Sequence, residues 1–401
     1  MPDPYSFFRP LLAADKRWAA LDWRSAGAQA AEAADLTRCF ADAGVAALAK
    51  LLPVVLSIDP KWLVESESIE QFQADQAIFV VPAAALDDAQ TIDVCIGLRK
   101  QGRHLALQLE RAETIDTLPR AAFDYLQVDA TFAREQLSAG DLNDLERSPF
   151  RKIATAVGSV HAFEWLAGKR FDLSDSRFVT ILDPASGGER DLPRLQVLRL
   201  LNLVIQDADS REIEEVFRQE PRLSYNLLRL VNSVAVGAKT RINSFHQAIA
   251  LLGRRQLQRW LQLLIYADQL THGSKPNPLM QLAAQRGRQL ELLAAALGPG
   301  SAAAEAAEAA FMTGIFSLLD ILLKMPMSEI LRDLPLPSDV EAALALRQGQ
   351  LGTLLAVVLA GETGDFAQAQ ALLASLEIGP AAHAAAQVGA FYWAARINSE
   401  R

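Results

Sequence analysis

The stretch Leu223-Ser-Tyr-Asn-Leu-Leu-Arg-Leu-Val-Asn-Ser233, followed by Arg241-Ile-Asn-Ser-Phe-His-Gln-Ala-Ile-Ala-Leu-Leu-Gly253 and then by Trp260, decides the fold of the C-terminal half. Apolar residues recur at helical spacing in and after both segments: Leu223, Leu227, Leu228, Leu230, Val231, Ala248, Ile249, Leu252, Leu257, Leu261 and Leu264. This periodicity predicts two amphipathic helices packed on a common core. Neither segment has a residue pattern typical of catalysis.

In residue detail the same passage resembles the HDOD domain, a helical signalling module related to the metal-dependent HD phosphohydrolases. The resemblance rests on Pro221 before Leu-Ser, on the Leu-Leu-Arg-Leu-Val-Asn-Ser run that ends at Ser233, on Ala248-Ile249 before Leu-Leu-Gly, and on the Trp-Leu-Gln-Leu-Leu that begins at Trp260. It implies a helical domain that is similar to an enzyme but lacks the catalytic residues.

Length and composition limit the class of protein. A chain of 401 residues exceeds what one hydrophobic core usually organises, so we expect two domains. Apolar residues make up 51% and charged residues 22%, which is typical of a folded globular protein and not of a disordered chain. The net charge of -9 disfavours a general nucleic-acid or anionic-membrane binder, because both need a positive surface.

Cysteine content and targeting signals indicate the compartment. Cys39 and Cys95 lie far apart in no paired motif, which predicts neither a disulfide framework nor a cysteine metal site. The N-terminus lacks a basic region followed by an apolar run, and no later segment is long enough to span a bilayer without charges. We therefore expect a soluble cytoplasmic protein without membrane insertion.

The N-terminal half alternates short apolar runs with helical stretches. The predicted strands are 54–58, 77–81, 104–109, 125–128 and 178–181, and the predicted helices are 28–52, 91–101 and 161–167. Such alternation favours a parallel α/β sheet or barrel. Because a (β/α)8 barrel typically takes about 250 residues, this barrel would be compact or incomplete.

The segment Asp183-Pro-Ala-Ser-Gly-Gly-Glu-Arg-Asp-Leu-Pro193 combines prolines, adjacent glycines and charges, which indicates a linker. Beyond it the chain is rich in leucine and alanine at helical spacing. We therefore predict an α/β domain at 1–183, a linker at 184–193 and an all-helical HDOD domain with a C-terminal extension at 194–401. Linker composition further predicts that a cut between 186 and 191 gives two soluble pieces.

The N-terminal half resembles a degenerate or shortened EAL domain, the (β/α)8 barrel that hydrolyses cyclic di-GMP. The matches are Arg9-Pro10, Leu98-Arg-Lys-Gln-Gly102 before Leu105-Ala-Leu107, Phe123-Asp-Tyr-Leu-Gln-Val-Asp129 and Lys152-Ile-Ala-Thr-Ala-Val157. With the HDOD resemblance, this implies an EAL-HDOD two-domain signalling protein.

The resemblance departs from the family at the residues that hold its two metal ions. Where the family carries acids, an asparagine or a lysine, the matching positions here are Ala20, Ser57, Val81 or Pro82, Gln108, Leu109, Gln127, Thr155 and Gly158, while Asp129 remains. Hard divalent cations require oxygen ligands, and one carboxylate cannot hold two of them. We expect Asp129 to cap a helix after its strand.

The helical half offers no metal-binding set either. A His-Asp dipeptide is absent, and the five histidines, His104, His161, His246, His272 and His383, show no metal-ligand spacing. Asp320, without histidine companions, is expected to hydrogen-bond a neighbouring helix end. We expect no cofactor, no metal and no catalytic residue.

One basic cluster is a candidate partner-binding surface: Lys239, Arg241, Arg254, Arg255 and Arg259. On an otherwise acidic protein such a cluster can steer an acidic partner, although a solvated helix face has the same composition. Nucleic-acid binding through this cluster is opposed by the overall charge.

These observations predict a non-catalytic bacterial signalling protein that acts through other signalling proteins. The alternative is a receptor that binds cyclic di-GMP in the barrel without cleaving it, through cations such as Arg9, Arg24 or Arg99. A homo-oligomer is compatible with either reading.

Overall fold

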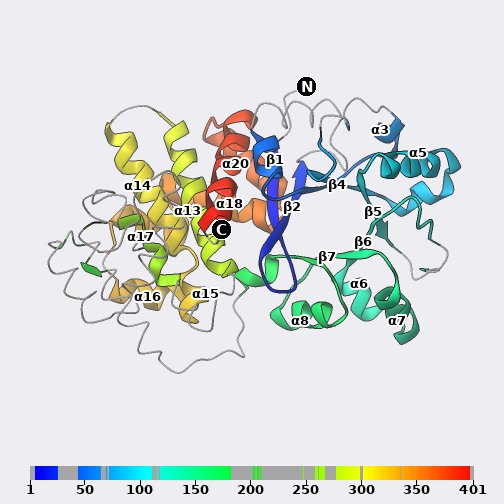
Figure 1. Ribbon diagram of the computed structural model, residues 1–401. Coiled ribbons are helices and arrows are strands. Elements are labelled where there is room, and N and C mark those ends of the chain that lie inside the picture. The colour runs from blue at the N-terminus through cyan, green and yellow to red at the C-terminus, as the bar shows by residue number, and fades with distance from the viewer. Residues whose placement is uncertain are drawn as a thin grey trace. The chain divides into compact units, whose positions relative to one another are not determined.

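A computed structural model shows an eight-stranded barrel and a set of helices (Figure 1). It describes residues 5–25, 44–64, 69, 72–110, 115, 118–181, 202, 203, 206, 208, 247, 258–260, 262–266, 277–298, 301–334 and 336–397. The linker at 184–193, the segment 223–233 and all of 241–253 except residue 247 lie outside the described residues.

The strands of the barrel close in chain order. They are β1 (Ser6–Leu12), β2 (Trp18–Ser25), β3 (Val54–Ser57), β4 (Ala77–Val81), β5 (His104–Leu109), β6 (Tyr125–Asp129), β7 (Arg151–Thr155) and β8 (Leu173–Asp175). β1 is antiparallel to both of its neighbours, and every other pair is parallel. The barrel is thus complete within the first 181 residues, not incomplete. It needs fewer residues than a typical (β/α)8 barrel partly because β1 and β2 are joined without a helix.

Helices connect most of the strands from β2 to β8, and a last turn follows β8 (Figure 1). They are α2 (Val45–Ala49), α3 (Pro60–Val64), η1 (Ala83–Asp87), α5 (Ala89–Lys100), α6 (Ala130–Glu135), α7 (Ala139–Arg147), α8 (Val160–Gly168) and η3 (Arg177–Thr180). The strands predicted at 54–58, 77–81, 104–109 and 125–128 and the helices predicted at 91–101 and 161–167 are confirmed. The strand predicted at 178–181 is wrong, because this segment forms the 3₁₀ turn η3 after the last strand.

The interior of the barrel is filled by one apolar layer. Its residues come from every strand: Leu11, Ala20, Val55, Ile78, Val80, Ala106, Tyr125, Ile153 and Leu173. Side chains alternate between the two faces of a strand, so residues two positions apart face the same side. Arg9, Asp22 and Asp175 each lie two residues from a member of this layer on the same strand, and they therefore face the interior as well. The interior layer therefore fixes which polar residues meet inside the barrel.

By backbone contacts the chain divides into two compact units, and the barrel unit includes two late segments. It consists of Met1–Ile181 together with Ala360–Ala374 and Gly379–Val388. Within this unit the Phe8 N–H donates to Gln387 Oε1 at 2.9 Å, and the rings of Phe7 and Phe366 stack with centroids 4.8 Å apart. Residues near the C-terminus thus belong to the core of the N-terminal fold.

The remaining described helices follow the HDOD-like passage. They are α13 (Pro278–Ala296), α14 (Ser301–Phe316), α15 (Leu319–Leu323), α16 (Met327–Asp333), α17 (Ser338–Leu346), α18 (Gly349–Thr363), α19 (Phe366–Ser375) and α20 (Pro380–Ile397). The described part of 194–401 is helical, as predicted.

α13 and α14 cross at close range because each contributes a glycine. A Cβ atom placed on Gly314 would lie 2.6 Å from the backbone of Arg286 and Gly287. Asn277 fixes the start of α13, since its side chain accepts from the Met280 N–H while its amide donates to the Tyr266 carbonyl at 2.8 Å.

Two stretches in this half are long and apolar enough to cross a membrane by length and composition, although both contain charged residues: Ala304–Leu323 and Ser338–Thr363. In the first, 72% of the most apolar window is buried inside the protein, as expected of a core helix. The second is not one continuous helix, because Arg347 and Gly349 adopt positive φ between α17 and α18. In the second stretch 44% of the most apolar window is buried.

Candidate functional site at the barrel mouth

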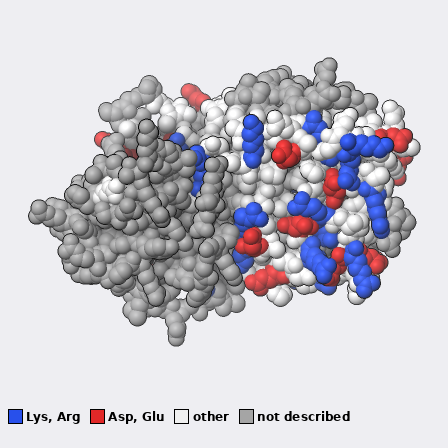
Figure 2. Space-filling model, in the orientation of Figure 1, with Lys and Arg blue, Asp and Glu red and all other residues white. Residues whose placement is uncertain are grey.

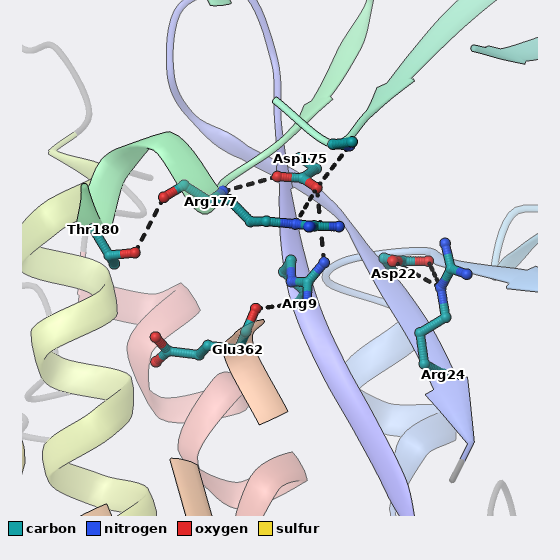
Figure 3. Close-up of polar contacts among 8 residues, drawn as sticks. Arg9, Asp22, Arg24, Asp175, Arg177, Thr180 and Glu362 are labelled. Atoms are coloured by element: carbon teal, nitrogen blue, oxygen red, sulfur yellow. Dashed lines mark hydrogen bonds and ion pairs between the residues drawn. The ribbon is translucent and has the colours of Figure 1, made fainter. Parts of the chain in front are cut away.

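Two Asp-x-Arg pairs lie at the carboxyl ends of neighbouring parts of the barrel. Asp22 and Arg24 come from β2, and Asp175 and Arg177 come from the end of β8 and the turn after it. Arg24 Nε lies 3.0 Å from both carboxylate oxygens of Asp22. In Figure 3, Asp175 and Arg177 lie above Arg9, and Asp22 and Arg24 form a separate pair beside it.

Asp175 is the most heavily contacted acid of this group. Its carboxylate accepts from the Arg177 N–H at 2.8 Å, from Arg177 Nε at 3.0 Å and from the Ala156 N–H at 3.1 Å. Arg9 Nη1 adds an ion pair at 3.7 Å. With its side chain only 3% exposed, Asp175 therefore has its charge balanced entirely by protein groups.

Arg9 links the barrel to the late segment of its unit. Its Nη2 donates to the Glu362 carbonyl at 2.6 Å, in the last turn of α18, where a cation complements the helix dipole. Burial lowers the pKa of Arg9, while the nearby Asp175 raises it. Its Nε has no hydrogen-bond partner, so Arg9 keeps one donor unused inside the protein.

Asp129, the acid that the sequence comparison retains, caps a helix. Its carboxylate accepts from the N–H groups of Thr131 at 2.8 Å and Phe132 at 3.0 Å, at the start of α6. The predicted capping role is confirmed. Gln108 and Gln127 lie side by side in the register of β5 and β6, so two amides stand where metal ligands were expected in the family.

The comparison with the EAL pattern placed Ala20 at an acidic position of the family and did not select the nearby acid Asp22. Ala20 is fully buried in the apolar layer of the barrel, and Asp22, two residues on, is the acid of β2 that faces the interior. Asp22 lies opposite Arg9 in the register of β1 and β2. Sequence reasoning did not select Asp22 or Arg177, although the repeated Asp-x-Arg spacing at strand ends could have drawn attention to both.

The group can receive an anion but is poorly suited to a divalent cation. Arg9, Arg24 and Arg177 outnumber Asp22 and Asp175, which leaves an excess positive charge. Arg24 and Arg177 keep 39% and 40% of their side chains exposed. Among the residues that the structure describes, no cluster of three or more His, Cys, Asp or Glu side chains could hold a metal ion.

Arg99, the third cation considered for a nucleotide, lies elsewhere. It ends α5, where its Nη1 donates to the Phe123 carbonyl at 2.8 Å and its Nη2 pairs with Asp124 at 2.5 Å. These partners precede β6, so Arg99 belongs to the opposite end of the barrel from Arg24. Over the face shown in Figure 2, positive and negative side chains of the barrel unit are interspersed.

Of the candidate partner-binding cluster, only Arg259 falls in the described part of the chain. It forms an ion pair with Glu291 and lies over the Phe311 ring, 4.9 Å from the centroid. The side chain is 22% exposed, so Arg259 is a packed residue and not a solvated one. Lys239, Arg241, Arg254 and Arg255 lie outside the described residues, and the role of this cluster stays a prediction.

The remaining residues singled out in the sequence have local roles. Asp320 accepts from the Ile321 N–H at 2.9 Å in the first turn of α15. Cys95 is buried and unpaired, and burial raises the pKa of its thiol to about 11, which makes it unreactive. Trp260 is 3% exposed and lies 5.9 Å from the Trp393 ring, a core position.

Comparison with known proteins gives a family match for part of the helical half. Residues 193–323 match the family model of the HDOD domain. The cyclic di-GMP phosphodiesterase CdgJ of Vibrio cholerae is 34% identical over 160 residues, which cover 40% of this chain and 36% of CdgJ. The uncharacterised protein YuxH of Bacillus subtilis is 30% identical over 169 residues, 42% of this chain and 40% of YuxH. The matched regions thus span well under half of either relative.

Similar solved structures include EAL-domain proteins. The EAL enzyme Bd1971 in its cGMP-bound form is 10% identical, with 43% of this chain and 61% of that chain covered and a TM-score of 0.36. BlrP1 of Klebsiella pneumoniae, in a complex with calcium and cyclic di-GMP, is 17% identical over 43% of this chain and 54% of that one, with a TM-score of 0.35. The chain thus combines a closed eight-stranded barrel with a match to the HDOD domain at residues 193–323.

Proposed function

We propose that this protein is a non-catalytic, cytoplasmic regulator in cyclic di-GMP signalling that acts through contacts with other proteins. One observation carries the proposal: the carboxylates at the mouth of the barrel are already bound by groups of this same chain. Asp22 is held by Arg24, Asp175 by Arg177, Ala156 and Arg9, and Asp129 by the first turn of α6.

Two-metal hydrolysis of a phosphodiester needs carboxylates that are free to bind cations. An arginine that makes two contacts to a carboxylate competes directly for the lone pairs a metal would use. Releasing Asp175 would also leave Arg9, whose side chain is 11% exposed, without its carboxylate partner, which is unfavourable. The arrangement therefore favours a barrel that is stable without metal ions.

Binding of cyclic di-GMP without hydrolysis is the second candidate, and the arginines favour it. Arg24 and Arg177 are partly exposed at the mouth, and Arg9 has an unused buried Nε. Guanidinium groups bind phosphate with paired hydrogen bonds and need no metal ion. Such a receptor would still transmit its signal through a protein partner.

Turnover and binding can be measured on one preparation of the full chain. Cyclic di-GMP is incubated with the protein and Mg²⁺ or Mn²⁺, with CdgJ as the positive control because it is named a phosphodiesterase. We expect no linear product. Metal-dependent turnover that is lost in Asp129→Ala or Asp175→Asn would overturn the non-catalytic assignment.

Calorimetry with cyclic di-GMP then separates the two candidates. If the barrel is a receptor, Arg24→Ala and Arg177→Ala each weaken binding by about tenfold or more, because each removes a charged hydrogen bond. Arg134→Ala, on the exposed side of α6, is the control and leaves binding unchanged. Absence of heat, with protein partners recovered from the native cell, supports the first candidate alone.

A further inference from the structure

A pocket in the helical unit is built from one buried amide, two acids and an apolar wall. The residues lining it come from the segment 258–262, from α14 and from the start of α17: Gln258, Arg259, Gln262, Glu305, Glu308, Ala309, Phe311, Met312 and Pro337. All but Pro337 fall within the HDOD match.

Among the residues that line the pocket, the buried amide carries a buried polar atom without a hydrogen-bond partner. Gln262 is 2% exposed, and its Oε1 has no hydrogen-bond partner. A buried carbonyl oxygen without a donor costs free energy, so native proteins rarely keep one without a reason. Gln262 lines the pocket, so a small rotation of its side chain would let a hydrogen-bond donor of a ligand reach this oxygen.

The charges at the pocket favour a positive ligand. Arg259 is held in an ion pair with Glu291, which also accepts from Arg288 Nη1 at 2.7 Å, and the pocket lining carries two acids, Glu305 and Glu308, against this one cation. Glu305, one turn before Glu308 on α14, is exposed and has no ion pair or hydrogen bond to any residue that the structure describes. Gln262 Oε1 and the Glu305 carboxylate therefore offer a ligand two acceptors, one neutral and one charged.

The size of the pocket limits what can enter. Its volume of about 180 Å³ is smaller than the roughly 300–1,000 Å³ of sites that enclose a drug-sized molecule. A cyclic dinucleotide exceeds it, whereas one long side chain does not. Phe311 and Met312 supply an apolar wall for the methylene stem of such a side chain.

We propose that this pocket binds an arginine side chain of a partner protein, with Gln262 and Glu305 accepting hydrogen bonds from its guanidinium group. A planar group with several donors suits an amide carbonyl and a carboxylate on different helices better than a compact ammonium does. The proposal rests on the proposed function, since it names the chemistry by which a protein partner is recognised.

The five methionines allow a direct test on the full chain, because only Met312 lines the pocket. Methyl-¹³C methionine is incorporated, and the Met312 signal is assigned with Met312→Leu. The probes are acetylated and amidated Gly-Gly-Arg-Gly-Gly and matched peptides with lysine, citrulline or glutamate. We expect the arginine peptide to shift the Met312 signal saturably, the lysine peptide to act more weakly, and the other two to have no effect.

Two variants connect the shift to the proposed contacts. Gln262→Met removes the amide at nearly constant volume, and Glu305→Gln removes an exposed charge, so both are expected to fold. Each variant is expected to lower the affinity for the arginine peptide by about tenfold, the loss expected for one charged hydrogen bond. Glu329→Gln, an equal change of charge on the exposed part of α16, leaves binding unchanged.

Three results overturn the proposal: no Met312 shift with the arginine peptide, a shift that both variants leave unaltered, or binding of free L-arginine as tight as that of the peptide. We expect free L-arginine to bind more weakly than the peptide, because Glu305 repels its α-carboxylate. Equal binding would therefore assign the pocket to a small molecule. None of these results depends on turnover of cyclic di-GMP, so failure here and failure of the non-catalytic assignment are distinguishable.

Discussion

His383 shows how one residue ties the late segment to the barrel. Its ring is buried between Tyr5 and Phe7, with centroids 5.8 and 5.0 Å away. Gln387 Nε2 lies 3.1 Å from His383 Nε2, while Gln387 Oε1 accepts from the Phe8 N–H. Because an amide nitrogen is a donor, His383 Nε2 is the acceptor and the ring is neutral. Burial lowers the pKa of His383 to about 3.

This residue should make the unfolding free energy depend on pH. The unfolded chain protonates His383 near pH 6.5 and the folded chain only near pH 3, so the folded state binds fewer protons between these values. Its contribution to stability is therefore fully present above pH 6.5 and is lost as the pH falls, by up to about 1.4 kcal/mol per pH unit.

Urea unfolding of the wild type and of His383→Phe at several pH values between 4 and 7 measures this contribution. The variant is expected to lose most of the slope while keeping an aromatic ring against Tyr5 and Phe7. His161→Gln, at an exposed position in α8, is the control and keeps the slope. Equal slopes in the wild type and His383→Phe would show that His383 does not carry the effect.

The strands predicted from the sequence correspond to β3, β4, β5 and β6, whereas β1, β2, β7 and β8 were not predicted. β4 (Ala77–Val81) is buried at every position, and such a run indicates a strand covered on both faces. β2 (Trp18–Ser25) was missed because Asp22 and Arg24 interrupt its pattern, and β8 (Leu173–Asp175) because it has only three residues. In a small closed barrel an inward-facing position can be polar, so apolar periodicity alone does not find these strands.

The candidate site was missed for a related reason. Local sequence predicted the Asp129 cap, since an acid at the end of a strand often begins the next helix. The pairing of Asp175 with Arg9 depends on β1 being antiparallel and lying beside β8, which no local pattern specifies. Only closure of the barrel brings residues 9 and 175 together.

The close crossing of α13 and α14 predicts that adding one methyl group at Gly314 destabilises the protein. Gly314→Ala places a Cβ 2.6 Å from backbone atoms of Arg286 and Gly287, a distance that requires the helices to separate. We expect a loss of about 1–3 kcal/mol or more in the unfolding free energy, because backbone atoms move less readily than side chains. Thermal unfolding followed by circular dichroism gives the change in Tm.

Gly97→Ala is the matched control for that measurement. Gly97 lies inside α5, and a Cβ there meets no atom within 4 Å. Alanine has the higher helix propensity, so this variant should gain about 0.4–1 kcal/mol. A Gly314→Ala protein as stable as the wild type would mean that the two helices tolerate a wider separation.

The path of the chain between its two compact units changes what a cut at the linker should do. Sequence composition predicts two separable soluble pieces after cleavage between 186 and 191, a site outside the described residues. The barrel unit nevertheless includes Ala360–Ala374 and Gly379–Val388. A cleaved N-terminal piece would therefore leave part of its own core on the other fragment.

We expect the two fragments to remain associated after cleavage at a protease site placed in the linker, and residues 1–183 expressed alone to unfold without cooperativity. The alone-expressed piece lacks the partners of Phe7, the Phe8 N–H and Arg9, which leaves a ring exposed and two donors without acceptors. Size-exclusion chromatography of the cleaved protein measures association.

Gln387→Ala, which removes one of these contacts at about 1–3 kcal/mol, should make the fragments separate at lower urea, whereas Gln370→Ala, exposed on α19, should not. Fragments that separate without denaturant and each unfold cooperatively would show that the late segments are dispensable to the barrel.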